Sequence, residues 1–291
     1  MPRISKRKSV PRQARQKESG RQGIIAVRRA LQLLEILAGA DTGSGMSLSE
    51  LARRLDINKQ IVFRLVGTLT DAGFVYKNSQ SELISLTYKI TNIGFRKMIQ
   101  EKILNQASSI ARELARETGE LVRIAVVERD ELIWVLTELG QQKTLNINPN
   151  YTPGITLNTT ATGKAWLSTM TRDEVDRIFD KTPPVKRTPH AITDRTKIYS
   201  ELDKVRSTGW ALSYDESELG ISAIAAPIII QSYGGESRCV GTISVAAPTH
   251  RMSRKALDAL GPRILKATSR LAEIWPQFSS DDETELSLSR S

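Results

Sequence analysis

The residues best placed to do chemistry form a row of mainly polar side chains between residues 59 and 68. They recur with the spacing of one helix face. Basic, amide and hydroxyl groups on such a face can bond base edges or phosphates when the helix lies in the major groove of DNA. The row comprises Lys59, Gln60, Phe63, Arg64, Gly67 and Thr68. Its pattern predicts a DNA-reading helix.

Within this row we expect different side chains to contact different parts of DNA. Arg64 and Gln60 suit base edges, whereas Lys59 and Thr68 suit phosphate. Lys77, in a polar turn after the row, is also placed to meet phosphate. Ser49, in the preceding helical segment, completes the predicted DNA-binding set.

Catalytic chemistry has weaker candidates. The two histidines, His190 and His250, lie in no metal-ligand spacing and beside no evident nucleophile. The segment ATGKA at 161–165 resembles half of a phosphate loop, but it lacks the first glycine and the hydroxyl residue after lysine. The acidic residues at 215–218 fall in a predicted turn, where we expect them to cap or stay solvated. We therefore predict neither an enzyme nor a bound metal or cofactor.

Two short helices and a hairpin must position the row. Ser47 and Glu50 form a capping-box pattern that starts a helix at Leu48. Asn58 is a natural cap for the second helix, and Gly73 supplies a left-handed stop.

Two short strand patterns follow, at 74–76 and 83–86, around the polar turn 77–81. Two helices and an immediate hairpin are typical of a winged helix-turn-helix. An ordinary helical hairpin with a polar face is the alternative.

The charge of the chain is uneven. Residues 1–29 hold ten Lys and Arg against one acidic residue, and so carry nine of the ten net positive charges. A basic arm beside a DNA module suits phosphate contact, although a solvated tail is the alternative.

The N-terminus has no apolar segment typical of a secretory signal. The longest strongly apolar run, at 221–230, is too short to span a bilayer. A single cysteine, Cys239, suits a reducing cytoplasm.

Composition and periodicity predict two domains with extensions. The predicted parts are a disordered basic arm at 1–22, a winged helix-turn-helix at 23–87, a linker helix at 88–104, an effector-binding domain at 105–278 and a disordered tail at 279–291. The larger domain mixes about six strands, mostly joined by hairpins, with helices at both ends. We expect an α+β fold in which helices flank an antiparallel sheet, as in small-molecule sensor domains.

Five ordered blocks carry a family resemblance. They read VRRALQLLEILA, SLSELARRLDINKQIVFRLVGTLTDAGFV, TATGKAWLS, GWALSYDESELGISAIAAPI and GTISVAAP, and span about residues 24–274. In these blocks the chain resembles IclR-type bacterial transcriptional regulators. The resemblance implies a homodimer or a dimer of dimers on a palindromic double-stranded operator. It also implies a GAF-like C-terminal domain that binds a small metabolite.

The resemblance places an effector pocket at three regions. The first runs from Asn158 to Lys164, where free N–H groups at a helix start suit a carboxylate. The implied pocket residues are Asn158, Thr160, Ala161, Thr162, Gly163, Ser213, Ala223, Ser244 and Ala246. In family members that bind small polar acids, the positions of Ser213, Ala223 and Ala246 often hold Asp, Cys and Ser.

These three smaller or less polar residues predict that the ligand is larger or more apolar than glyoxylate, such as an aromatic or branched acid. Trp134, Leu145 and Trp166 could add apolar wall, although core packing is the alternative for them.

Besides a regulator and an enzyme, a third class of protein is an architectural DNA-binding protein, but about 170 residues of non-basic sensor domain argue against it. We expect ligand binding to alter operator binding, in either repression or activation.

Overall fold

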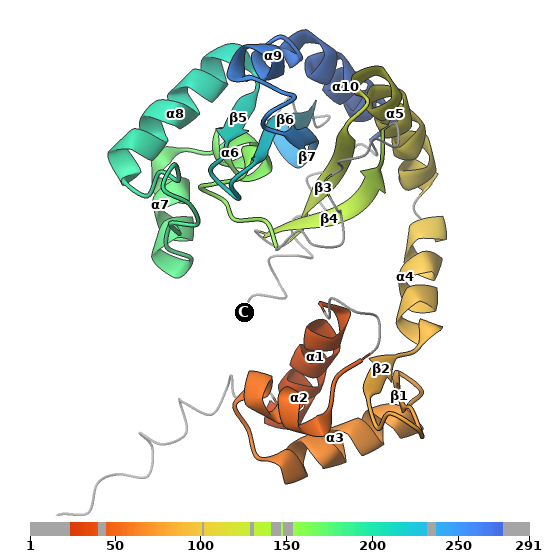
Figure 1. The fold of residues 1–291 in the computed structure, drawn as a ribbon. Helices are drawn as coiled ribbons and strands as arrows, with labels where there is room; N and C mark the ends of the chain where they lie inside the picture. The colour runs from red at the N-terminus through yellow and green to blue at the C-terminus, as the bar shows by residue number, and fades with distance from the viewer. Residues whose placement is uncertain are drawn as a thin grey trace, which may run out of the picture. The chain divides into compact units, whose positions relative to one another are not determined.

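A computed structural model of the chain describes residues 24–39, 45–100, 102–128, 131–140, 147, 154–231 and 237–275. Its contacts divide into two units that meet between Lys97 and Met98 (Figure 1). The basic arm, the acidic tail and Leu145 lie outside the described residues. The predicted domain boundaries therefore stay predictions. Among the described helices, none is long and apolar enough to cross a bilayer.

The N-terminal unit is a winged helix-turn-helix. It contains α1 (Ile25–Ala38), α2 (Leu48–Leu55), α3 (Lys59–Asp71), β1 (Val75–Lys77) and β2 (Ile84–Leu86). The two strands form an antiparallel hairpin. One apolar cluster joins these elements, and it comprises Leu33, Leu37, Met46, Leu51, Val62, Val66, Leu69, Val75 and Ile84.

Side-chain caps fix the starts of α2 and α3. The Ser47 hydroxyl accepts a hydrogen bond from the Glu50 amide at 3.2 Å. The predicted capping box is only half formed, because the Glu50 carboxylate binds Arg53 and Arg54 instead. The amide of Gln60 donates to Asn58 Oδ1 at 2.8 Å, which confirms the predicted cap of α3.

The helix α4 (Tyr88–Gln100) begins against the winged motif, and α5 (Lys102–Thr118) follows it. Thr87 Oγ1 donates to the Gly73 carbonyl at 2.6 Å. Lys89 Nζ donates to the Ala72 carbonyl at 2.7 Å and lies 4.9 Å from the centre of the Phe74 ring. These contacts tie the start of α4 to the end of α3.

The C-terminal unit is built on a five-stranded antiparallel sheet in the order β4-β3-β7-β6-β5. Its strands are β3 (Leu121–Glu128), β4 (Glu131–Glu138), β5 (Ala211–Tyr214), β6 (Ile221–Gln231) and β7 (Ser237–Pro248). About six strands were expected, and the described residues contain five in this sheet.

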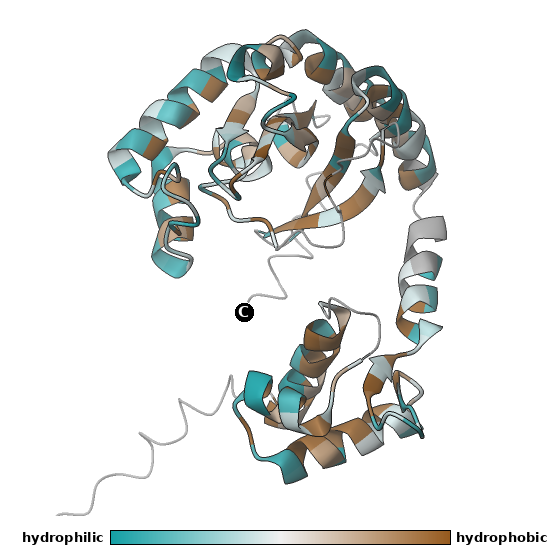
Figure 2. Cartoon of the chain, in the orientation of Figure 1, coloured by the Kyte–Doolittle hydropathy of each residue, from teal (hydrophilic) through white to brown (hydrophobic). Residues whose placement is uncertain are grey.

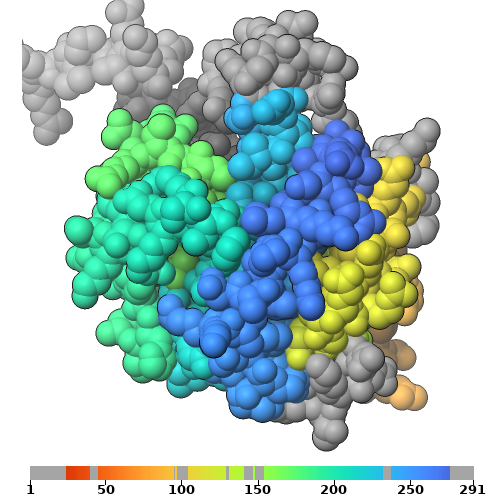
Figure 3. Space-filling view, turned by 90° about the horizontal axis from the view of Figure 1, so that it is seen from above, coloured from red at the N-terminus to blue at the C-terminus, as the bar shows by residue number. Residues whose placement is uncertain are grey.

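Helices cover both faces of this sheet. The remaining helices are α6 (Ala161–Leu167), α7 (Arg172–Lys181), α8 (Arg195–Thr208), α9 (Arg254–Asp258) and α10 (Gly261–Ile274). The main core lies between the sheet and α5, α9 and α10; α5 and α10 are neighbours (Figure 3). On the other face, α6 packs on β5, β6 and β7, and α7 and α8 cover it. Figure 2 shows apolar residues gathered on β3 and β4, and hydrophilic residues along α8.

Local backbone chemistry fixes the ends of the last helices. Asp194 caps α8, because its Oδ1 accepts from the Lys197 amide at 2.9 Å. The segment that follows β7 forms two helices, α9 and α10. Pro262 lies in the first turn of α10, where its missing N–H leaves no hydrogen bond unmade, and its ring disfavours a continuous helix through this point.

Candidate functional site

The exposed face of α3 carries the predicted DNA-reading row. Val62, Val66 and Leu69 are buried, so the helix turns the residues between them outward. Lys59, Gln60, Phe63, Arg64 and Thr68 are all exposed. Neither Lys59 nor Arg64 forms an ion pair within the described part of the chain. Their charges are therefore available to a polyanion.

Phe63 is the apolar member of this face. Its side chain is 64% exposed, and with Leu48, Lys59, Gln60 and Arg64 it lines a surface depression. Ser49 is exposed on the neighbouring helix α2. Apolar side chains in the major groove can contact the methyl group of thymine.

The wing contains an internal ion pair. Lys77 Nζ binds the Glu82 carboxylate across the turn between β1 and β2. Both side chains are substantially exposed, so this pair adds little stability. The predicted contact of Lys77 with phosphate requires it to exchange this partner.

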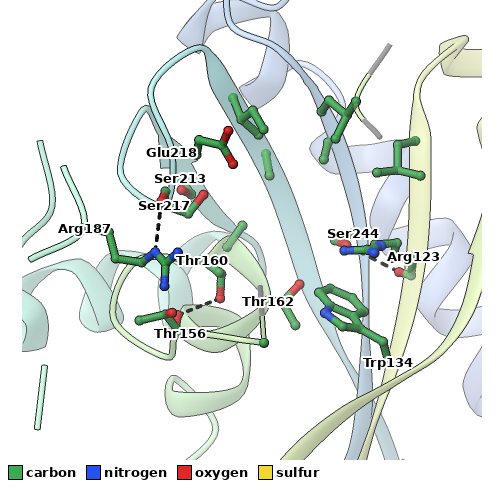
Figure 4. A pocket seen from close by; sticks show the side chains of 17 residues that line it. Arg123, Trp134, Thr156, Thr160, Thr162, Arg187, Ser213, Ser217, Glu218 and Ser244 are labelled. Carbon is green, nitrogen blue, oxygen red and sulfur yellow. Dashed lines mark hydrogen bonds between the residues drawn. The ribbon is translucent and has the colours of Figure 1, made fainter. Parts of the chain in front are cut away.

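The C-terminal unit holds a cavity of about 70 Å³ between the sheet and the start of α6 (Figure 4). Eight predicted effector residues line it, namely Trp134, Thr160, Ala161, Thr162, Ser213, Ala223, Ser244 and Ala246. Further lining comes from Ser217 and Glu218, which lie between the predicted residues Ser213 and Ala223. Arg123, Thr156 and Arg187 also line the cavity, and the sequence did not single them out.

The alternation of the strands explains which residues reach this cavity. On β3, Val122 and Ile124 enter the main core while Leu121 and Arg123 line the cavity. On β7, Ile243 and Val245 likewise enter the core. Antiparallel pairing then places the lining residues in two rows across the sheet. These rows are Ser213, Ala223, Ala246 and Leu121, and Ser244 and Arg123.

A positive charge lies in the wall of this cavity. Arg123 is only 7% exposed, and its guanidinium lies 4.7 Å from the centre of the Trp134 ring. Burial lowers the pKa of Arg123. Even so, an arginine keeps its charge in proteins. The signal in the sequence was one arginine within the apolar strand LVRIAVVE.

Polar groups also belong to the rest of the cavity wall. The indole N–H of Trp134 is buried and has no hydrogen-bond partner among the described residues. Thr160 Oγ1 caps α6 by accepting from the Gly163 amide at 3.0 Å. Ser213 Oγ donates to the Thr159 carbonyl at 2.6 Å, and Ser244 Oγ donates to the Arg123 carbonyl at 3.4 Å. The two serine hydroxyls therefore offer lone pairs more readily than protons.

Two predicted effector residues support the cavity without lining it. The Asn158 amide nitrogen donates to the carbonyls of Val185 and Ile192, and its oxygen accepts from the Val185 amide at 3.1 Å. Gly163 packs so closely that a Cβ there would lie 2.4 Å from the backbone of Leu157. The prediction that Asn158 and Gly163 face a ligand is corrected to a supporting role, because their surroundings are protein backbone.

Two charged side chains lie at the cavity from the loop side. Arg187 Nε donates to the Ser217 carbonyl at 3.3 Å, as Figure 4 shows. Glu218 is exposed, as predicted for this acidic segment.

In the described part of the chain, no three His, Cys, Asp or Glu residues could hold a metal ion together. Burial raises the pKa of the Cys239 thiol to about 11, which makes it a poor nucleophile.

Comparison with known proteins decides the family. The family profile "IclR helix-turn-helix domain" matches residues 26–79, and "Bacterial transcriptional regulator IclR C-terminal" matches residues 96–273. The chain belongs to the IclR family. Like other IclR proteins, it is a DNA-binding transcriptional regulator with a C-terminal effector-binding domain.

Named IclR relatives and a solved structure agree with this assignment. The chain is 29% identical to the regulator BhcR of Paracoccus denitrificans, over 86% of this chain and 87% of that one. It is 27% identical to KdgR of Escherichia coli, over 80% and 87%. An IclR regulator of Alicyclobacillus acidocaldarius shares the fold, with a TM-score of 0.74 at 21% identity over 87% and 99%.

A buried ion pair braces the effector domain of this IclR protein. Lys164 Nζ donates to both Glu216 oxygens at 2.6 Å and to the Leu212 carbonyl at 3.2 Å. The Thr188 hydroxyl donates to the carbonyls of Asp215 and Glu216. The expectation that Glu216 is a cap or solvated is therefore wrong. The pair joins α6 to the turn that carries Ser217 and Glu218 to the cavity.

We predict that Lys164→Met destabilises the protein by about 3–5 kcal/mol, because it leaves a buried carboxylate without its partner. Burial already raises the pKa of Glu216, and removing Lys164 raises it further. The folded variant then binds more protons than the unfolded chain, so its stability falls as pH rises above the ordinary pKa of a glutamate. Urea unfolding at several pH values measures both effects.

The double variant Lys164→Met with Glu216→Met is the control. It removes both charges, so we expect it to recover most of the lost stability. Additive losses in the double variant would show that the two groups do not act as a pair.

Proposed function

We propose that this IclR-family chain binds a palindromic operator as a homodimer or a dimer of dimers, and that a small carboxylic acid in the Arg123 cavity alters this binding. The observation that carries the effector proposal is the buried guanidinium over Trp134 in the cavity wall. The exposed polar face of α3 supports the DNA-binding part. A bacterial DNA regulator of this kind works in the cytoplasm.

An exposed apolar stripe supports pairing of two copies. Ile24, Val27 and Leu31, at the start of α1, are 73%, 53% and 56% exposed. Their spacing places them on one helix face. Such a stripe on a regulator of palindromic sites suits a second copy, because a two-fold operator needs two reading helices.

The size of the effector cavity favours a compact ligand. A cavity of about 150 Å³ holds benzene, whereas this one measures about 70 Å³. Of the two predicted ligand types, the branched acid therefore fits better than the aromatic one. Leu121, Ile221 and the small residues Ala223 and Ala246 suit its apolar part. The carboxylate would bind Arg123 and the Trp134 indole N–H.

The elements that surround the effector cavity can transmit the effect of ligand binding to the rest of the domain. Ligand contacts would fall on α6 and on the strands that also build the core, so binding would favour one arrangement of the effector domain. The coupling free energy between an effector site and a second binding site is typically about 1–3 kcal/mol. The proposal is that the ligand thereby shifts the protein between dimer or tetramer geometries with different half-site spacing.

Removal of the proposed base contact should weaken operator binding. Arg64→Ala is expected to lose about 1–3 kcal/mol per half-site, or roughly five- to 150-fold in affinity for each half-site, and to relax base preference at one position of each half-site. A gel-shift assay on a site obtained by in vitro selection measures this. Arg172→Ala, an exposed arginine of the effector domain, is the matched control. Unchanged affinity and selectivity in Arg64→Ala would refute the assignment of the reading helix.

The basic arm should contribute to the salt dependence of DNA binding. Deleting residues 1–21 removes eight Lys and Arg side chains. Each lost phosphate contact should make the slope of log affinity against log salt shallower by about 0.9. Fluorescence anisotropy across a salt series measures the slope. The same slope in both proteins would assign the arm to the solvated tail.

The effector site should prefer compact apolar acids and depend on Arg123. Calorimetric titration of the full chain should show isobutyrate and isovalerate binding more tightly than glyoxylate or benzoate. Arg123→Met should weaken these acids by about 1.5–3 kcal/mol, because it removes a hydrogen bond to a charged group.

Two controls make this test specific. Isobutyramide has the shape of isobutyrate without its charge, so its weak binding should be the same in both proteins. Arg112→Met changes an exposed arginine on α5 and should leave the affinities unchanged. Tight binding of glyoxylate alone, or acid binding that survives Arg123→Met, would contradict the proposal.

A further inference from the structure

A second cavity lies on the other side of α6 from the first. It measures about 730 Å³, within the size range of small-molecule sites. Its apolar lining comprises Leu132, Ile155, Leu157, Trp166, Met170 and Ile178. We propose that it is a second ligand site, for an amphipathic carboxylate with an extended apolar body.

The two cavities are separate, although they share a wall. None of the described lining residues is common to both. Thr156 lines the effector cavity, whereas its neighbours Ile155 and Leu157 line the second one. Likewise, the first turn of α6 lines the effector cavity, and Trp166 and Met170 line the second. A ligand in the second cavity therefore occupies a different site from the effector.

The lining is suited to a flexible apolar body. Trp166 is only 3% exposed, so its ring offers a mostly buried apolar surface to a ligand. Met170 has an unbranched, adaptable side chain that can adjust to different ligand shapes. This cavity is partly open to solvent, so it is not a packing void of the interior.

The charges on α7 indicate the sign of the ligand. Arg177 and Lys181 are one helical turn apart, line the cavity, and form no ion pair with any described residue. Other arginines nearby are paired: Arg172 binds Asp203 at 3.4 Å, and Arg195 binds Asp176 at 2.7 Å. The two cations of α7 that lack an ion pair therefore line the cavity.

Of the two acids at this cavity, Glu174 is engaged by Thr171. Glu174 accepts from the amide and hydroxyl of Thr171 at 2.7 and 2.8 Å, and these hydrogen bonds lower its pKa. Its carboxylate is therefore committed to capping α7. Glu131 belongs to the opposite wall, on β4. An anionic head at Arg177 and Lys181 with its apolar tail over Trp166 satisfies both parts of the lining.

The test uses the full chain with octanoate as the probe and octanol as its neutral counterpart. We expect saturable octanoate binding by calorimetry, weakened about tenfold or more in Arg177→Gln with Lys181→Gln. Octanol binding should not change in that variant. Arg172→Gln, whose arginine is paired outside the cavity, is the matched control and should bind octanoate normally.

Other outcomes would overturn the proposal. Absence of saturable binding, or equal octanoate affinity in the double variant, would show that these cations do not form a ligand site. Loss of octanoate binding in Arg123→Met instead would place the probe in the effector cavity. A changed oligomer mass by light scattering in the double variant, without a change in octanoate affinity, would assign this surface to a second copy of the chain.

Discussion

The two-residue alternation of side chains across the C-terminal sheet is the constraint on which the effector domain depends. Each long strand supplies one set of residues to the core under α5 and α10 and the other set to the cavity beside α6. A slip of one residue would exchange the two sets and bury Arg123 in the main core, where no cavity would receive its charge. The same register therefore secures both the stability of the domain and the position of its charged wall.

The sequence was most informative where signals are local. Asn58, Gly73 and the hairpin that follows act within a few residues of the elements they end, so the winged motif could be predicted closely. The cavity depends on pairs far apart in the chain, such as Arg123 with Ser244. Spacing alone could not show that Arg123 faces a cavity, that Glu216 meets Lys164, or that Asn158 holds a loop. The family resemblance located the region, and the sheet register decided which side chains line it.

The two halves of the chain differ in how they carry charge. The reading face of α3 presents exposed cations without ion pairs in the described structure, where water and salt weaken each interaction. In the effector domain, Arg123 and the Lys164–Glu216 pair are buried, so each interaction is stronger and the loss of a partner costs more. This difference suits a regulator whose DNA binding must be reversible while its ligand site keeps a fixed shape.

The small number of polar groups on α3 favours the proposed pairing of two copies. Two bidentate contacts, from Gln60 and Arg64, would contribute about 1–3 kcal/mol each. Specific DNA binders usually prefer their site over other DNA by about 4–10 kcal/mol. One reading helix would therefore reach only the lower part of that range, and two helices on the proposed palindrome would double the contribution. In the proposed mechanism, an effector that changes the spacing of two modules by a small amount would then remove half of the discrimination without touching either reading helix.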